Sequence, residues 1–176
     1  MRPRVVDSLQ PTPFLQRFSS KMAQAAGNYP VIDVACGTGR NGIFLAQLGI
    51  KVVFIDKDLS RLPADGHELH PLTLTRQRCD LITDPWPFRE STVGGIVLID
   101  FLHLPLIPRF EHCLTSGGLL LLETVSGRGE NYRELPRVGE LRAAVQNGFE
   151  IDFYRESPCG PAPLMRVSVK MVVRRL

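Results

Sequence analysis

The stretch Val31-Ile-Asp-Val-Ala-Cys-Gly-Thr-Gly-Arg40 decides the fold of this chain. Its apolar half predicts a short buried strand, Val31–Ala35. The glycines that follow predict a sharp turn, because glycine adopts positive φ without steric cost. A helix is expected directly after the turn, from about Arg40 to Gly49. That helix is expected to bury Ile43, Phe44 and Leu48.

Strands and helices alternate outward from this stretch. Residues Phe14–Ala26 have helical spacing, and their apolar face is expected to hold Phe14, Leu15, Phe18 and Met22. Further strands are expected at Lys51–Ile55, Leu72–Arg78, Gly95–Ile99, Gly118–Glu123, Glu150–Glu156 and Val167–Arg174. The alternation predicts an α/β fold, a Rossmann-like three-layer sandwich around a mostly parallel seven-stranded sheet. The turn Ser157–Pro163 is too short for a crossover helix, so the last strand is predicted to run antiparallel between its neighbours.

Proline and glycine mark the irregular segments. Leu59–Pro71 is expected to form one or two helical turns at most, because Pro63 and Gly66 interrupt it. Asp84–Phe88 is expected to be a rigid packed turn with Trp86 in the core. A proline-broken helical segment is expected between the fourth and fifth strands. Later in the chain we expect a polar loop over Ser126–Leu135 and a helix over Val138–Asn147.

Length and composition favour one globular domain over residues 1–176, with residues 1–12 as a flexible arm. The contents of 44% hydrophobic and 22% charged residues are ordinary for such domains. The net charge of +3 is spread along the chain, so nucleic acid is not indicated as a partner. The cysteines Cys36, Cys79, Cys113 and Cys159 lack metal-ligand spacing, and we expect free thiols and no metal. No apolar run is long enough to cross a membrane, so we expect a cytoplasmic protein.

Acidic side chains gather where the predicted strands end. Asp56, Asp80 and Asp100 follow the second, third and fourth strands, and Asp33 lies inside the first. In an open parallel sheet, ligands bind beyond the carboxyl ends of the strands. Gly37-Thr-Gly-Arg-Asn-Gly42 matches the GxGxxG pattern that leads into a helix. An acid at the end of the second strand is well placed to hydrogen-bond a ribose diol, which predicts a nucleoside-bearing cofactor.

A nicotinamide- or flavin-dependent oxidoreductase is the rival enzyme class, since it uses the same glycine pattern and ribose acid. Three features argue against it. The clustered acids suit a cationic sulfonium better than an anionic pyrophosphate. The chain ends in a strand–turn–strand rather than a crossover helix, and 176 residues leave little room for a separate substrate domain.

With these motifs placed, the sequence resembles the class I S-adenosylmethionine-dependent methyltransferases. Val31–Arg40 looks like their cofactor motif, and Asp56, Asp80 and the segment Ile99–His103 fall where their later motifs lie. Other details are similar to a subgroup related to bacterial tellurite-resistance methyltransferases. They are Gly-Arg-Asn after the turn, Pro85-Trp-Pro-Phe88, Asp100-Phe-Leu-His103, and Val138-Gly-Glu-Leu-Arg142 before a final strand with Tyr154 and Glu156. The degraded helix around Pro63 and Gly66 departs from the pattern and implies a more open cofactor pocket.

The resemblance implies S-adenosyl-L-methionine as cofactor and S-adenosyl-L-homocysteine as product. Asp33 would lie near the methionine amino group, Asp56 at the ribose hydroxyls, Asp80 with its neighbours at the adenine edge, and Asp100 beside the sulfonium. The implied cofactor-binding residues are Asp33, Ala35, Cys36, Gly37, Thr38, Gly39, Arg40, Asn41, Asp56, Lys57, Cys79, Asp80, Leu81, Ile99 and Asp100.

His103 and Asp100 are the candidate catalytic residues. His103 follows the fourth strand, and histidine is the side chain that most often transfers protons near neutral pH, so it is a candidate general base; local packing is the alternative. The Ser126–Leu135 loop, with Arg128, Tyr132 and Arg133, is expected to face the acceptor. We expect a small-molecule acceptor of unidentified structure, and no motif indicates an oligomeric state. A catalytically silent cofactor-binding partner or sensor subunit, and an RNA methyltransferase, stay open as alternatives.

Overall fold

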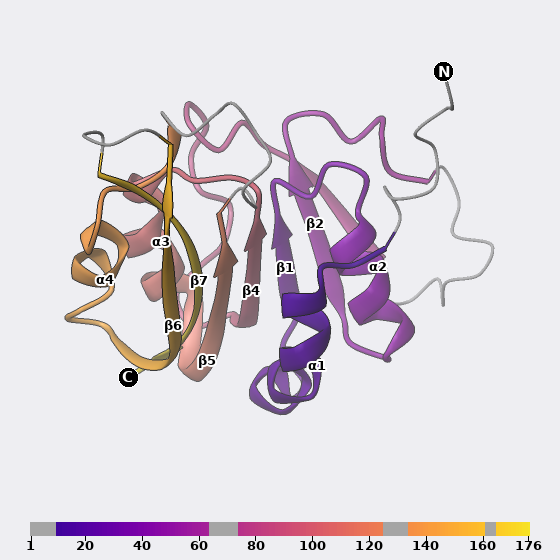
Figure 1. The fold of residues 1–176 in the computed structure, drawn as a ribbon. Helices are drawn as coiled ribbons and strands as arrows, with labels where there is room; N and C mark the ends of the chain where they lie inside the picture. The colour runs from indigo at the N-terminus through magenta and orange to yellow at the C-terminus, as the bar shows by residue number, and fades with distance from the viewer. Residues whose placement is uncertain (1–9, 64–73, 125–133, 161–164) are drawn as a thin grey trace, which may run out of the picture.

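Seven strands form one sheet in the order β3-β2-β1-β4-β5-β7-β6 (Figure 1). The computed structural model describes residues 10–63, 74–124, 134–160 and 165–176. The strands are β1 (Val31–Val34), β2 (Val52–Asp56), β3 (Leu74–Arg78), β4 (Val93–Ile99), β5 (Leu114–Glu123), β6 (Phe149–Cys159) and β7 (Arg166–Arg175). Neighbours among β1 to β5 pair in parallel, whereas β7 pairs antiparallel with both β5 and β6. The prediction of a mostly parallel sheet with an antiparallel last strand between its neighbours is confirmed.

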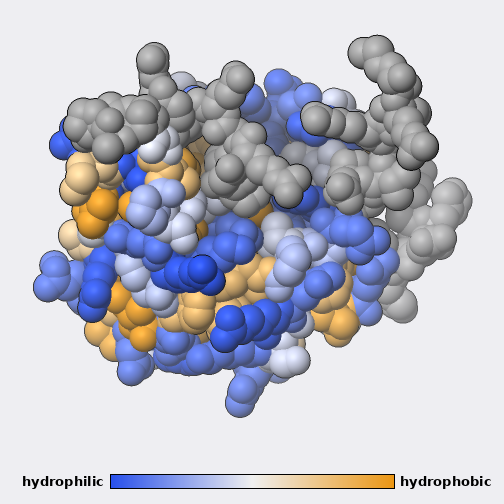
Figure 2. All heavy atoms as spheres, viewed as in Figure 1, coloured by the Kyte–Doolittle hydropathy of each residue, from blue (hydrophilic) through white to orange (hydrophobic). Residues whose placement is uncertain are grey.

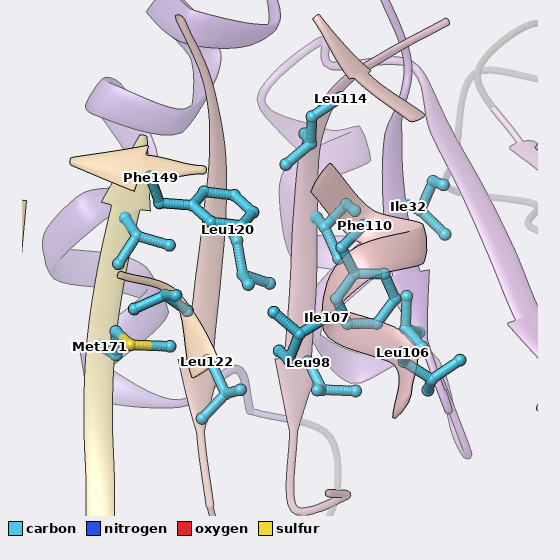
Figure 3. Packing of buried hydrophobic residues seen from close by; sticks show 14 of the residues in the cluster. Ile32, Leu98, Leu106, Ile107, Phe110, Leu114, Leu120, Leu122, Phe149 and Met171 are labelled. Carbon is cyan, nitrogen blue, oxygen red and sulfur yellow. The ribbon is translucent and has the colours of Figure 1, made fainter. Parts of the chain in front are cut away.

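Helices cover both faces of the sheet, which confirms the three-layer sandwich. The helices are α1 (Pro13–Ala26), α2 (Arg40–Gln47), the short 3-10 helix η2 (Leu104–Leu106), α3 (Ile107–Cys113) and α4 (Glu140–Ala144). α1 and α2 pack on one face. α3 and α4 pack on the other, where Ile107 and Phe110 meet Ile32 and Leu98 (Figure 3). Every residue of β4 is buried, as expected for a central parallel strand covered on both faces.

The close packing of α1 on β4 depends on two glycines. A Cβ on Gly94 would stand 2.6 Å from the backbone of Ala26, and one on Gly95 would stand 2.3 Å from Sδ of Met22. At Gly94 the obstacle is backbone, so this glycine allows the close approach of helix and strand, whereas at Gly95 a side chain would displace the end of Met22. The predicted apolar face of α1 is confirmed for Phe14, Leu15 and Met22, which are buried.

The predicted burial of α2 was wrong for Leu48 and only partly right for Ile43 and Phe44. The buried residues of α2 are Asn41, Gly42, Leu45 and Ala46, whereas Leu48 is 52% exposed after the helix has ended. Ile43 and Phe44 are only partly buried. The buried face of the helix therefore includes Asn41 and Gly42, which an apolar pattern alone does not select.

Several element boundaries also differ from the sequence prediction. α4 is shorter than the expected Val138–Asn147, and β4 and β5 begin earlier than expected. The prediction of a turn at Ser157–Pro163 was wrong at its start, because β6 continues to Cys159 and Pro158 pairs with Val167. β6 is the edge strand, and an edge strand tolerates proline because one row of its backbone groups needs no partner in the sheet.

Several expectations lie outside the described residues. They are most of the first twelve residues, most of the Leu59–Pro71 and Ser126–Leu135 segments, and the first residues of the predicted third strand. Trp86 packs against Phe88 and Phe110, with ring centroids 5.2 and 5.4 Å away, so the packed turn is confirmed. The described helices include none long and apolar enough to span a membrane. On the face shown in Figure 2, hydrophilic side chains surround scattered apolar ones among the described residues.

Candidate functional site

A cavity of about 590 Å³ opens where β1, β2 and β4 end and the chain leaves β3. This is the edge of a parallel sheet at which ligands bind in α/β folds, and the volume is typical of a small-molecule site. Its described lining residues are Asp33, Ala35, Cys36, Gly37, Thr38, Arg40, Asn41, Asp56, Lys57, Arg61, Asp80, Leu81, Ile82, Ile99, Asp100 and Phe101.

Asp33 is a buried carboxylate behind the glycine turn. The Gly42 amide donates to its Oδ2 at 2.8 Å, which joins β1 to the first turn of α2. A Cβ on Gly42 would stand 2.8 Å from that oxygen and 2.5 Å from the Phe54 ring, so this contact requires glycine. Burial raises the pKa of Asp33 to about 7, although the Gly42 amide and nearby Arg40 act in the opposite direction.

Asp56 holds the glycine turn in shape. Its Oδ2 accepts from the Gly37 amide at 2.9 Å, and its Oδ1 accepts from the Asp58 amide at 3.1 Å. Each carboxylate oxygen has a second lone pair and can accept a further hydrogen bond from a ligand. The acid at the end of β2 is therefore both part of the turn and a wall of the cavity.

Two residues that line the cavity have strained backbones. Ala35 has φ 53° and Asp100 has φ 59°, in the left-handed region that side-chain-bearing residues rarely adopt. They follow the neighbouring strands β1 and β4. The Asp100 carboxylate forms an ion pair with Arg40 at 3.1 Å, which connects the end of β4 to the start of α2 across the cavity edge. Strain of this kind concentrates at functional sites.

Asp80 shapes the third side of the cavity. Its Oδ1 accepts from the Ile82 amide at 3.0 Å, and its own amide donates to Asp84 at 2.8 Å. This compact turn places Leu81 and Ile82 against the cavity, with Leu81 buried and Ile82 60% exposed. An apolar surface beside carboxylates is suited to a flat, partly polar ring system.

Solved structures resemble this fold, although no protein-family model and no curated protein sequence matches the chain. An S-adenosylmethionine-dependent methyltransferase from Methanosarcina mazei has a TM-score of 0.65 at 17% identity, covering 96% of this chain and 99% of that one. A TehB-like methyltransferase from Corynebacterium glutamicum has 0.64 at 20% identity, with 93% and 88% covered. A geranyl diphosphate C-methyltransferase from Streptomyces coelicolor has 0.65 at 13% identity, with 92% and 80% covered. The chain has the methyltransferase fold.

In this methyltransferase fold the cavity gathers most of the residues that the sequence analysis named. Gly39, Cys79 and His103 are the exceptions, since they are not among the described lining residues. Gly39 supports the site from behind, where a Cβ would stand 2.4 Å from Cδ2 of Leu62. Cys79 is buried in the core. His103 is partly buried at the start of η2, where its carbonyl accepts from the Leu106 amide at 3.0 Å, so its role as a base stays a prediction.

Three lining residues were missed by the sequence analysis: Arg61, Ile82 and Phe101. Ile82 directly follows the named residue Leu81, and Phe101 lies inside the named segment Ile99–His103, where it had been given no role. Arg61 carried no signal, because the segment around it had no clear secondary-structure pattern. Its presence corrects the electrostatic argument: Arg40, Lys57 and Arg61 stand among the four acids, so the cavity carries charges of both signs.

The cysteine of the turn, Cys36, lies in an environment that does not favour a nucleophilic thiolate. Burial, with nearby Asp33 and Asp56, raises the pKa of the Cys36 thiol far above its usual range. The reactive form of cysteine is the thiolate, which such an environment suppresses. All four cysteines are free, and the described residues contain no cluster of three metal-ligating side chains. The site therefore offers carboxylates, guanidinium groups and backbone amides for binding.

Proposed function

We propose that this chain is an S-adenosylmethionine-dependent methyltransferase that acts as one domain over residues 1–176 and methylates a small-molecule acceptor. The main observation behind the proposal is a hydrogen bond between the glycine turn after β1 and Asp56, the acid at the end of β2. The Gly37 amide donates to Asp56 at the mouth of a cavity in a methyltransferase-fold sheet. In this arrangement the Asp56 carboxylate can accept hydrogen bonds from the ribose of the ligand. The glycines have no side chains, so the ligand can come close to the backbone of the turn.

The residues of the cavity fit the chemistry of this cofactor. S-adenosylmethionine carries an ammonium, a carboxylate and a sulfonium group, so a binding site needs both acidic and basic side chains. The cavity supplies Asp33, Asp56, Asp80 and Asp100 together with Arg40, Lys57 and Arg61. The pyrophosphate of a dinucleotide carries only negative charge, whereas a cavity that holds four acids beside three basic side chains suits the mixed charges of S-adenosylmethionine better.

Each part of the cavity has a proposed role. Asp56 accepts hydrogen bonds from the ribose hydroxyls, and Asp33 attracts the methionine ammonium. Asp80 and Leu81 border the adenine, while Ile99 and Asp100 border the sulfonium. These residues lie at or near the ends of β1, β2, β3 and β4, as expected for a ligand that binds along the carboxyl edge of the sheet.

The cofactor supplies an electrophilic methyl group, and the chain supplies orientation and shielding from water. Ile99 and Phe101 give the transfer region apolar walls beside the Asp100 carboxylate. Direct transfer needs in-line placement of the acceptor atom about 3–3.5 Å from the methyl carbon, and a reactive acceptor then needs no base. The Arg40–Asp100 ion pair holds the strained Asp100 backbone in place at this position.

Two further observations support a small acceptor and a reducing compartment. The structural neighbour from Streptomyces coelicolor was solved with geranyl diphosphate, a small molecule, and S-adenosyl-L-homocysteine. All four cysteines here are free thiols, which is typical of cytoplasmic proteins. We therefore propose a cytoplasmic enzyme with a small acceptor, and a screen of thiols, amines, carboxylates and oxyanions for cofactor-dependent products would identify it.

Calorimetric binding of S-adenosyl-L-homocysteine and NAD tests the proposal. The wild-type chain should bind S-adenosyl-L-homocysteine and bind NAD poorly. Asp56→Ala should weaken S-adenosyl-L-homocysteine binding by about 1–3 kcal/mol, because a charge-assisted hydrogen bond is lost. Asp56→Asn is the matched variant, since an amide oxygen can still accept from Gly37, and an unfolding curve separates lost binding from lost structure. Tight NAD binding without any response to S-adenosyl-L-homocysteine would reject the assignment.

A further inference from the structure

The turn after β2 is fixed by a series of short-range hydrogen bonds. Asp56 accepts from the Asp58 amide at 3.1 Å, and Asp58 accepts from the Ser60 amide at 2.9 Å. The Leu62 amide then donates to the Leu59 carbonyl at 3.1 Å. These bonds define the backbone from Asp56 to Leu62, so the side chains of the turn have set directions.

Leu62 anchors the far end of this turn in the core. It is 8% exposed and belongs to the apolar cluster beneath α1 and α2. Its Cδ2 lies only 2.4 Å from where a Cβ on Gly39 would stand. The turn is therefore seated directly against the glycine turn that follows β1, and Arg61 comes immediately before this anchor.

Arg61 extends from this turn into the cavity. It is an exposed residue that lines the cavity, and its Nη1 lies 3.9 Å from the position of a Cβ on Gly37. The Gly37 amide is the group that donates to Asp56. The guanidinium of Arg61 and the carboxylate of Asp56 thus both lie near the same glycine, although their positions in the sequence had suggested no shared role.

We infer that Arg61 determines recognition of the ribose, in partnership with Asp56; this inference rests on the proposed function. A ribose diol both donates and accepts hydrogen bonds. A carboxylate only accepts them, and a guanidinium only donates them. Asp56 accepts hydrogen bonds from the ribose hydroxyl groups, and Arg61 donates hydrogen bonds to the hydroxyl oxygens. The pair recognises both halves of the diol, whereas Asp56 alone recognises one.

The role is specific to the nucleoside half of the cofactor. Arg40, the other guanidinium of the cavity, is paired with Asp100 at the end of β4, on the opposite side of β1 from β2. Arg61 presents several N–H donors in a rigid planar fork. Lysine has a single ammonium in place of the planar fork and should replace it only in part.

Calorimetry with two ligands tests this role. S-adenosyl-L-homocysteine contains the nucleoside and the amino-acid part, and 5′-methylthioadenosine lacks the amino-acid part. Arg61→Ala should weaken binding of both ligands by the same factor, about 10- to 150-fold, as expected for lost hydrogen bonds from a charged group. Arg61→Lys should recover part of the loss. Arg89→Ala removes an exposed arginine outside the cavity lining and should leave both affinities within about twofold, since exposed charges act weakly at a distance.

The outcomes separate the two proposals. If Arg61→Ala weakens S-adenosyl-L-homocysteine but leaves 5′-methylthioadenosine unchanged, the residue contacts the amino-acid part and the ribose role is overturned. Unchanged binding of both ligands would overturn it as well. A folded wild-type chain that binds neither ligand would overturn the proposed function together with the inference. Because Arg61 is exposed, its replacement should leave the unfolding curve unchanged, and this confirms that binding is compared between folded proteins.

Discussion

At the residue scale, the site contains a buried carboxyl group and two residues with strained backbones. Asp33 is buried, and Ala35 and Asp100 have left-handed backbones. Two of them have a specific side-chain contact: the Gly42 amide donates to Asp33, and the Arg40 guanidinium pairs with Asp100. The surrounding sheet and helices overdetermine these positions, which is the usual way in which a fold sustains local strain.

Ala35→Gly should stabilise the chain. An L-residue in the left-handed region costs about 1–2 kcal/mol, and glycine removes this cost but loses more entropy on folding, about 0.5–1 kcal/mol. The expected net gain is therefore between about 0 and about 1.5 kcal/mol in the free energy of unfolding by urea. Ala23→Gly inside α1 is the control and should destabilise the chain by about 1 kcal/mol. A loss of stability for Ala35→Gly would show that its methyl packing outweighs the backbone strain.

The ionisation of Asp33 should make stability depend on pH. Burial raises its folded pKa to about 7, so folded Asp33 keeps its proton where the unfolded chain has lost it. Its contribution to stability is full below about pH 4 and is lost as pH rises through 7. Relative to Asp33→Asn, the wild type should lose about 2–3 kcal/mol of unfolding free energy between pH 5 and pH 8. The unfolding free energy of both proteins would be measured by urea unfolding without ligand at each pH. If it changed with pH by the same amount in both, the predicted effect of Asp33 would be contradicted.

At the element scale, the starts of α1 and α2 are joined beside the cavity. Thr12 caps α1, because its hydroxyl accepts from the Leu15 amide at 3.2 Å. The Thr12 amide donates to Oδ1 of Asn41 at 3.2 Å, and Asn41 lines the cavity in the first turn of α2. The helix that begins the described fold is thus attached to the helix that follows the glycine turn.

Thr12→Ala should therefore lower the free energy of unfolding by about 1 kcal/mol, through loss of the helix cap. Thr12→Ser retains a hydroxyl and should stay within a few tenths of a kcal/mol of the wild type. Thermal or urea unfolding of the three proteins measures the difference. If both variants lost the same stability, the methyl packing of Thr12 rather than its cap would be responsible.

At the scale of the whole molecule, the sheet has a parallel part that forms the cavity and an antiparallel part that completes the core. β7 lies between β5 and β6, so the last strand in the sequence is not the last strand in space. Its residues Val169, Met171 and Val173 join the cluster beneath α3 and α4, and Val172 faces α1 and α2. Both cores therefore depend on a strand formed from the end of the chain.

The sequence by itself determined the elements whose patterns are local. The apolar strand before the glycine turn and the alternation of strands and helices could be predicted from hydrophobic period and glycine conformation. The acids at the strand ends could be placed in the same way. The antiparallel last strand also followed, because a short connection forces the chain to reverse direction.

Only the tertiary structure decided which side chains face the cavity. Arg61 enters it because Leu62 is anchored against Gly39, a contact between segments that no local pattern connects. His103 is partly buried at the start of η2 and does not line the cavity, although its position after β4 suggested a place beside the reaction. The physical reason is that a periodic pattern fixes the face of a strand or helix, whereas the direction of a side chain in a turn depends on the packing of distant residues around it.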